Sequence, residues 1–313
     1  MPRFIRTQPP REFALPARRR RGRNLGPIFA LALMLAGDVW LLLQSGILDA
    51  WAGPPVTEEK PLPPPPVQPV QAAPSAVQDA TLVTFGDLDF HIVEVDSARQ
   101  DLRLFWKDAA SGERYGRPGV LEASLKRGGE TLLFATNAGM FQPDYRPVGL
   151  HVEEGKEWSP LDERSGLPGN FYLAPNGVFF VRANGQPGIQ TTDRFARERP
   201  ADIRLATQSG PMLVVGGRIH DAFNPRSESR FVRSGVGWKG GTRLVFALSA
   251  EPVTFFEFAR FFLEKCGCPD ALYLDGAISR FHVPSAGHPD PGGDFAGMLG
   301  VVLKETGEKT SGG

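Results

Sequence analysis

The sequence contains little cysteine: two residues in 313, Cys266 and Cys268, with one residue between them. This number excludes a disulfide-stabilised scaffold, and a bond between the two would close a strained ring. Glycine shows no regular period, which excludes a collagen-like chain. One stretch alone is long and apolar enough to cross a bilayer, which excludes a transporter with several spans.

Signatures of common enzymes are also missing. The sequence has no H-E-x-x-H, no G-x-S-x-G and no Walker loop. Its five histidines show no metal-ligand spacing: His91, His151, His220, His282 and His288. The sequence therefore predicts no metal and no other cofactor.

The chain has no net charge, but its charges are unevenly distributed. Lys plus Arg number 35, as do Asp plus Glu. Residues 1–24 hold eight Arg and one acid, Glu12, a net charge of +7, so the remainder carries −7. A mildly acidic remainder argues against nucleic acid as a partner.

An apolar segment follows the basic arm directly. Leu25–Leu43 is almost wholly apolar, and a helix of that length spans a hydrocarbon core of about 30 Å. Because arginine resists translocation, we expect residues 1–24 to stay cytoplasmic and the rest to be exported. Residues 25–49 are then a transmembrane signal anchor or a signal peptide cleaved near Ala52, where Ala50-Trp51-Ala52 fits a cleavage site.

The next segment predicts a spacer. Residues 54–74 contain nine prolines, a composition typical of a semi-rigid polyproline linker. We expect residues 50–79 to be this linker, 80–305 one folded exported domain, and 306–313 a disordered tail. The predicted location is the cell membrane, in a single pass with the domain in the periplasm or outside, or secretion after cleavage.

Hydrophobic residues make up 41% of the chain, enough for a sizeable core. β-Branched and aromatic runs separated by turn residues predict strands at 81–85, 89–95, 102–106, 131–135, 177–181, 213–215, 243–248 and 271–274. Helices are expected at about 119–126 and after Thr254, which forms a T-x-x-E capping box with Glu257. Regular alternation of strands with helices is absent, so the predicted class is α+β, a mixed and mostly antiparallel sheet core with a few packed helices.

Four clusters of polar residues and glycine lie at the ends of apolar runs. They are Thr136–Phe141, Gln208–Pro211, Ser229–Gly237 and Asp275–Ser279. Glycine beside a polar residue allows close backbone approach to a ligand, and an acid at the end of an apolar strand is costly unless it is used or paired. Each cluster alone is compatible with an ordinary turn, but the four together indicate a site.

These clusters resemble the phosphodiester glycosidase family, the family of the lysosomal uncovering enzyme, and its uncharacterised bacterial branch most of all. The resemblance rests on TNAGMF (136–141), PDYRPVGL (143–150), GNFYLAPNGVFF (169–180), ATQSGPMLV (206–214), RSGVGW (233–238), EPVTFFEFARFF (251–262) and ALYLDGAIS (271–279). It is dense over 130–280 and loose over 80–305. Family members often carry a further glycine where this chain has Ala277.

The resemblance implies hydrolysis of a sugar C1–phosphodiester link in envelope glycans or glycoconjugates. It assigns catalysis to Asp275 as the carboxylate, to Arg233 as the phosphate ligand and to Asn137 as a donor. It assigns substrate binding to Gly139, Gln208, Ser209, Gly210, Arg230, Gly276 and Ser279. Because i and i+3 face opposite sides of a strand, Arg230 is expected to play a lesser role than Arg233, such as pairing with an acid. The alternatives are a non-catalytic glycan-binding protein of the same fold and a structural envelope protein.

Overall fold

The computed structural model describes residues 80–276, 278–286 and 292–304. The predicted basic arm (1–24), membrane segment (25–49), linker (50–79) and tail (306–313) lie outside these residues, as does Ala277. Among the helices that are described, none is long and apolar enough to span a membrane.

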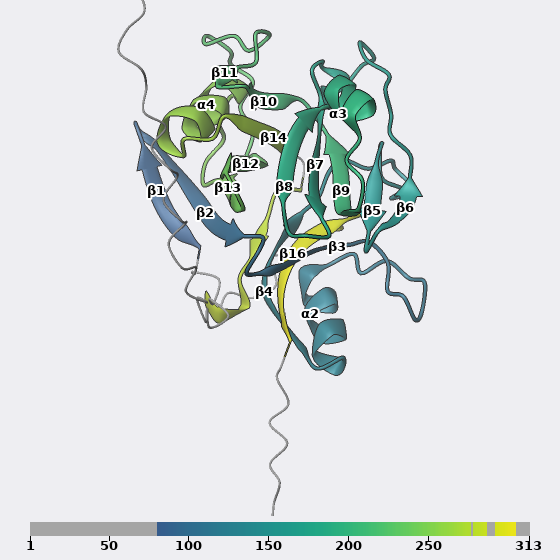
Figure 1. The fold of residues 1–313 in the computed structure, drawn as a ribbon. Helices are drawn as coiled ribbons and strands as arrows, with labels where there is room; N and C mark the ends of the chain where they lie inside the picture. Colours follow the sequence, from purple (N-terminus) through teal and green to yellow (C-terminus); the bar gives the residue numbers. More distant parts are fainter. Residues whose placement is uncertain (1–79, 277, 287–291, 305–313) are drawn as a thin grey trace, which may run out of the picture. The chain divides into compact units, whose positions relative to one another are not determined.

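Three β-sheets form the framework of the described chain (Figure 1). The first has the strand order β1-β2-β13-β12-β14-β10-β11, with the bounds Thr81–Phe85, Leu88–Asp96, Arg243–Ser249, Ser234–Gly240, Asp270–Asp275, Met212–Val215 and Arg218–Ile219. The second has the order β15-β4-β16-β3, with the bounds Phe281–His282, Glu130–Asn137, Met298–Lys304 and Asp101–Phe105. The third has the order β6-β5-β9-β7-β8, with the bounds Lys156–Ser159, His151–Glu153, Ile203–Ser209, Gly177–Arg182 and Pro187–Thr191.

Every pairing among these strands is antiparallel. The predicted α+β class is therefore confirmed. A shared core fills the space between the sheets, because each sheet buries one apolar face. Its members include Val93, Phe246 and Leu272 from the first sheet, Phe134 and Leu299 from the second, and Phe179 and Leu205 from the third.

The helices are few and lie at the margins of the sheets. Helix α2 spans Pro118–Arg127 and α3 spans Thr192–Glu198. Helix α4 spans Phe255–Arg260 and continues as a π-helical turn over Phe261–Lys265. Short 3₁₀ turns cover Asn170–Tyr172 and Pro284–Ala286.

Helix α4 begins as the sequence predicts. The Thr254 hydroxyl accepts the Glu257 N–H and the Glu257 carboxylate accepts the Thr254 N–H, so the capping box is confirmed. Phe258 and Phe262 are buried against the first sheet, as their helical spacing predicts. Phe261, three residues after Phe258, is fully buried too, and its ring stacks on Phe90 with centroids 3.8 Å apart.

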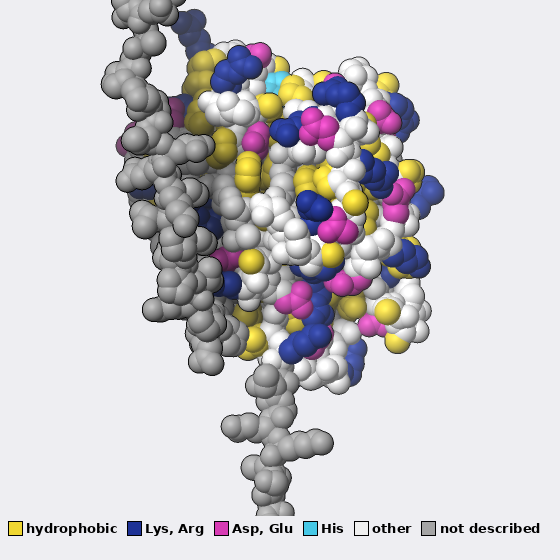
Figure 2. Space-filling model, viewed as in Figure 1, with side chains coloured by type: hydrophobic (Ala, Val, Ile, Leu, Met, Phe, Trp, Pro, Cys, Tyr) yellow, Lys and Arg dark blue, Asp and Glu magenta, His cyan; other side chains and the backbone are white. Residues whose placement is uncertain are grey.

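The surface carries mixed charge. On the face seen in Figure 2, basic and acidic side chains are interspersed rather than gathered by sign. A nucleic-acid-binding face concentrates positive charge, so this face does not resemble one.

Candidate active site

The ends of strands from all three sheets meet at one place. The Gly139 N–H, just after β4, donates to Thr207 Oγ1 of β9 at 3.2 Å. The Ser209 hydroxyl at the end of β9 donates to the Leu274 carbonyl of β14 at 3.0 Å. At the start of β12, Ser234 pairs with Asp275 at the end of β14. Residues of all four predicted clusters therefore lie close together. The cluster at 229–237 contributes Ser234, at the start of strand β12.

A buried hydrogen-bond network fixes the backbone of Asp275. Asn137 Nδ2 donates to Ser234 Oγ at 2.9 Å. The hydroxyls of Ser234 and Ser279 both donate to the Asp275 carbonyl oxygen, at 3.3 and 2.6 Å. Asn137 and Ser279 were predicted as site residues, whereas Ser234 was not singled out, although it lies in the RSGVGW stretch. The network holds the strand end that carries the Asp275 carboxylate.

The Asp275 side chain lies at the rim of this network. The residue is 9% exposed, and its Oδ1 accepts the Gly276 N–H at 2.6 Å. A carboxylate held this way at the end of a buried strand has the chemistry to act as a base or to face a developing positive charge.

Arg233 is the largest fully buried side chain of the described chain, at 1% exposure. Nε donates to the Val253 carbonyl at 2.9 Å and Nη2 to the Ser229 carbonyl at 3.3 Å. Its guanidinium carbon lies 3.7 Å from the Phe255 ring centroid. Burial lowers the pKa of the guanidinium from its ordinary value, but an arginine remains charged in a protein. Among the residues that the structure describes, none forms an ion pair with Arg233.

Tyr273 lies between Arg233 and the Asp275 region. Its hydroxyl accepts from Arg233 Nη1 at 3.4 Å, and burial raises the pKa of the phenol well above its ordinary value. The Asp275 charge raises that pKa further, so the two side chains are close enough to interact. Sequence reasoning missed Tyr273, although strand alternation puts residues 273 and 275 on one face of β14.

Arg230 lies away from this group. Its Nη2 forms an ion pair with Glu257 Oε1 at 2.7 Å, with both side chains partly exposed. The expected pairing of Arg230 with an acid is therefore confirmed. The substrate-binding role given to Arg230 stays a prediction, one that competes with this ion pair.

The Gln208 side chain is held by hydrogen bonds to Leu150, Asp162 and Thr192. Its Oε1 accepts the N–H groups of Leu150 and Asp162 at 3.0 and 2.9 Å. Its Nε2 donates to the Asp162 carbonyl at 2.7 Å and to Thr192 Oγ1 at 3.0 Å. A side-chain amide offers two donors and two acceptor sites, and all four are used. In this arrangement Gln208 has no capacity left for a sugar hydroxyl, and it positions loops instead.

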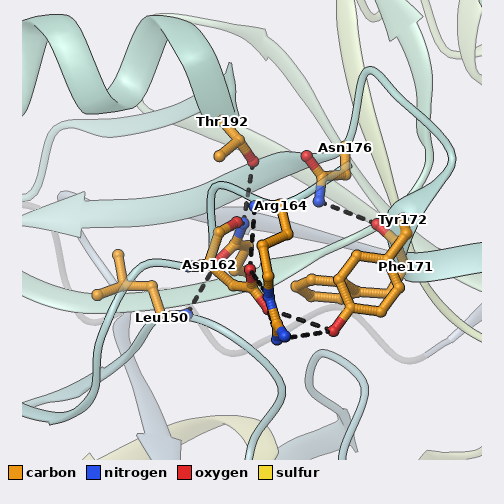
Figure 3. A network of polar contacts seen from close by, with 8 residues as sticks. Leu150, Asp162, Arg164, Phe171, Tyr172, Asn176 and Thr192 are labelled. Atoms are coloured by element: carbon orange, nitrogen blue, oxygen red, sulfur yellow. Dashed lines mark hydrogen bonds and ion pairs between the residues drawn. The ribbon is translucent and has the colours of Figure 1, made fainter. Parts of the chain in front are cut away.

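The same network continues at the loop surface. Arg164 forms an ion pair with Asp162 at 2.6 Å, and the Tyr172 hydroxyl lies 3.2 Å from the same carboxylate (Figure 3). The hydrogen bond from Arg164 holds the pKa of Asp162 below its ordinary value. The loops that flank the site are thus held together by residues 162–172 and by Gln208.

The predicted glycines lie where the chain packs most closely. A Cβ at Gly139 would come within 2.3 Å of the Gln208 carbonyl oxygen, and one at Gly276 within 2.0 Å of the Tyr273 hydroxyl. A Cβ at Gly210 would come within 2.6 Å of the Asn176 side chain. The close approach that glycine allows is therefore to neighbouring parts of the protein, and a substrate contact remains a prediction for all three.

Other chemistry in the described residues is limited. No group of three or more His, Cys, Asp or Glu side chains there could hold a metal ion. Burial raises the pKa of both Cys266 and Cys268 to about 12, so both thiols are poor nucleophiles, and they are not bonded to each other.

Asp144 is half exposed and pairs with Arg146 at 2.6 Å. Hydrogen bonds from Arg146 lower the pKa of Asp144, so it does not suit a general acid.

Comparison with known proteins identifies the family of the chain. The sequence pattern of the family described as phosphodiester glycosidase (NAGPA) matches residues 130–294. The uncharacterized protein YigE of Escherichia coli (strain K12) is 33% identical over 210 residues, which cover 67% of this chain and 80% of YigE. The chain belongs to the phosphodiester glycosidase family.

A solved structure shares the fold. It is the catalytic domain of zebrafish N-acetylglucosamine-1-phosphodiester alpha-N-acetylglucosaminidase, auto-inhibited by its pro-peptide. The match has a TM-score of 0.50 and 16% identity, and it covers 72% of this chain and 83% of that one. At this identity the likeness concerns the arrangement of the strands and not the substrate.

Proposed function

We propose that this protein is a hydrolase that cleaves the bond between C1 of a sugar and the oxygen of a phosphodiester. The observation that carries the proposal is Arg233, a buried cation with no ion-pair partner among the described residues. A buried charge is costly unless an opposite charge is supplied. A phosphodiester anion would supply it, and membership of this family makes a sugar phosphodiester the expected source.

The reaction needs one water and leaves no group unaccounted for. The water oxygen forms a bond to C1. The bond between C1 and the bridging phosphate oxygen breaks, and the phosphomonoester leaves with its electron pair. Asp275 takes the proton from water or faces the positive charge that develops at C1. Because a phosphomonoester leaves readily, a strong general acid is not required.

Arg233 and Tyr273 are suited to bind the phosphate. A guanidinium has five N–H groups, and three of those of Arg233 donate to described partners. Two N–H groups and the Tyr273 hydroxyl proton then remain for phosphate oxygens. Asn137 and Ser279 act by holding the Asp275 strand end through Ser234 and the Asp275 carbonyl.

Phe231 offers a surface for the sugar ring. It is 54% exposed, although the Arg233 guanidinium carbon lies only 5.4 Å from its ring centroid. Two backbone hydrogen bonds with Val253, of 3.1 and 2.8 Å, fix its position. Since Arg233 itself is 1% exposed, we expect the Phe231 ring to shift when the phosphate enters and then to pack on the sugar.

The proposed place of action is the cell envelope, because residues 25–49 are predicted to be a membrane anchor or a signal peptide. A reporter enzyme fused after residue 304 tests this. Activity only in an exported compartment supports the proposal, and activity in the cytoplasm contradicts it. A mature N-terminus at Gly53 would support secretion instead of anchoring.

The reaction is tested with synthetic methyl phosphodiesters of α- and β-linked N-acetylglucosamine and glucose in water enriched in ¹⁸O. We expect reducing sugar and methyl phosphate in equal amounts, with the label at C1 of the sugar. Label in the phosphate would show attack at phosphorus and contradict the proposal. Binding of a diester without release of sugar would support the alternative, non-catalytic glycan binding.

A further inference from the structure

A cavity that the proposed mechanism does not use lies next to the candidate active site. Its volume is 340 Å³, a size typical of pockets for small ligands. Its walls come from two segments, 142–149 and 159–164. The N–H of Val148, in the first wall, donates to the carbonyl of Met140 at 2.9 Å. Met140 directly follows Gly139, so this wall is continuous with the loop of the candidate active site.

The third sheet connects the other wall to the same loop. Ser159 of β6 pairs with His151 of β5, and His151 pairs with Thr207 of β9. Thr207 Oγ1 accepts the Gly139 N–H at 3.2 Å. Neighbouring strands lie about 4.8 Å apart, so Ser159 and Thr207 are separated by about 10 Å across the sheet. The cavity is therefore within reach of a sugar chain that has one end in the candidate active site.

The order of the strands gives the direction of such a chain. Strand β9 is bonded to β14 through Ser209, and β14 is paired with β12 at Asp275. The strands thus follow one another as β5, β9, β14 and β12, with the cavity at the β5 end. Arg233 and Phe231 precede β12, so the phosphate and the sugar attached to it are expected at the opposite end. A further sugar unit would extend into solvent or toward β9 and the cavity.

The cavity offers hydrogen-bonding groups that the described part of the chain does not use. The Gln142 side-chain amide and the Ser159 hydroxyl have no partner there. Arg164 donates from Nε and Nη2 to Asp162 and Tyr172, which leaves its Nη1 without a described acceptor (Figure 3). Sugar hydroxyls both donate and accept, so they match this mixture of amide, hydroxyl and guanidinium.

Trp158 supplies an aromatic ring beside these groups. It is the extra residue of a β-bulge directly before Ser159, and it is 44% exposed. Its ring packs edge to face with Trp106, whose Nε1 donates to the Tyr145 carbonyl at 3.0 Å. The Lys156 ammonium lies 3.5 Å from the Trp158 centroid and forms no ion pair with a described residue, so a ligand can displace it. A fixed, half-exposed indole of this kind suits the apolar face of a sugar ring.

We propose that the sugar part of the substrate is an oligosaccharide, and that this cavity and Trp158 hold the unit next to the one released from phosphate. The inference rests on the proposed hydrolase function, which places the phosphate at Arg233. The second unit is joined to the first through a hydroxyl other than the one at C1, so hydrolysis releases the oligosaccharide intact. Gln142, Ser159 and Arg164 bind its hydroxyls, and its ring packs on Trp158.

Matched substrates test the proposal: the methyl phosphodiester of the single sugar that the protein cleaves best, and those of disaccharides with the same sugar at the reducing end. We expect kcat/KM to be at least about tenfold higher for one of the disaccharides, because the second unit adds aromatic packing and hydrogen bonds. Trp158→Ala should remove most of this gain, and Gln142→Ala should reduce it about threefold. Neither variant should change kcat/KM on the single sugar by more than about twofold. Both side chains are exposed, so the melting temperature should change little.

The control variant is Val120→Ala, which changes an exposed apolar residue on helix α2 and should leave the gain intact. Equal kcat/KM for the single sugar and every disaccharide would overturn the proposal, as would a gain that survives in Trp158→Ala and Gln142→Ala.

The failure of the hydrolase function is distinguishable from the failure of this proposal. If no diester is hydrolysed, the proposed function is contradicted, and saturation-transfer NMR with methyl glycosides of the same disaccharides tests the cavity alone. Binding that Trp158→Ala abolishes and Val120→Ala preserves would support a sugar site at the cavity. Absence of binding, or binding that Trp158→Ala leaves unchanged, would overturn it.

Discussion

The guanidinium carbon of Arg233 lies 3.7 Å from the centroid of the Phe255 ring, whereas the described residues offer it no ion pair. A desolvated cation–π contact contributes about 2 kcal/mol. Removing an ion from water costs several kcal/mol even after the protein relaxes. The aromatic ring therefore offsets only part of the cost of burying Arg233, and an anionic substrate is suited to offset the rest.

The first prediction compares the two arginines of the RFVR stretch. Arg233→Lys keeps the charge but loses the planar fork, so we expect kcat/KM on a sugar phosphodiester to fall by the equivalent of about 1–3 kcal/mol. Arg230→Lys should cost less, because Arg230 pairs with Glu257 at the surface. Both variants are measured on one substrate, with the melting temperature checked alongside.

Two outcomes would contradict this assignment. Equal small losses in both variants would mean that neither arginine binds the phosphate. A larger loss in Arg230→Lys would place the phosphate on the opposite side of the chain, near Glu257.

The second prediction concerns the carboxylate. Asp275→Asn is nearly isosteric, and we expect turnover to fall by at least about 100-fold with little change in melting temperature. The matched control is Asp144→Asn, which changes a half-exposed acid paired with Arg146 and should leave turnover intact. Full activity of Asp275→Asn would remove the carboxylate from the mechanism. A large loss of stability would indicate that Asp275 serves the fold.

Much of the fold follows from hydrophobic patterning. All eight predicted strands exist, and the helix expected at 119–126 is α2, Pro118–Arg127. The other eight strands of the described residues were not predicted. Among them is β12, whose sequence SGVGWKG is rich in glycine, which disfavours strands. The structure gives the reason for the glycines: a Cβ at Gly235 or Gly237 would come within 3.1 or 2.6 Å of the Phe262 ring. Such a requirement depends on tertiary packing, which periodicity does not encode.

The candidate site was predictable to a similar degree. Polar residues at strand ends pointed to Asn137, Asp275 and Ser279, which one network joins. The direction of the Gln208 side chain was not predictable, because it depends on Leu150 and Asp162, which flank strands β5 and β6 and are distant in sequence. Sequence position indicates which residues lie near a site, but the partners that saturate a side chain come from the assembled fold.

The third prediction tests the positioning role of Gln208. Gln208→Leu leaves the N–H groups of Leu150 and Asp162 and the Thr192 hydroxyl without their partner, so the free energy of unfolding should fall by at least about 2 kcal/mol. Gln186→Leu is the control, since the half-buried Gln186 side chain makes one bond, to the Gly241 carbonyl, and its loss should cost less than about 1 kcal/mol. Chemical denaturation measures both. A stable Gln208→Leu protein with a strongly raised KM would instead support direct substrate binding.

The fourth prediction concerns the contact between Gly276 and Tyr273. A Cβ at residue 276 would lie 2.0 Å from the Tyr273 hydroxyl and 3.3 Å from its Cζ, so Gly276→Ala should destabilise the protein by about 1–3 kcal/mol. Tyr273→Phe removes the clashing oxygen together with its hydrogen bond from Arg233, at a cost of about 1 kcal/mol. The double variant should therefore be more stable than the sum of the two single effects predicts, by about 1 kcal/mol or more.

A double-mutant cycle in chemical denaturation gives this coupling energy, and activity gives a second, independent reading. If the Tyr273 hydroxyl helps to bind the phosphate, kcat/KM stays low in Tyr273→Phe and in the double variant although stability recovers in the latter. Recovery of both quantities in the double variant would mean that the hydroxyl matters only for packing. Strictly additive destabilisation would show that Gly276 is required for another reason, such as close approach of the substrate to the backbone after Asp275.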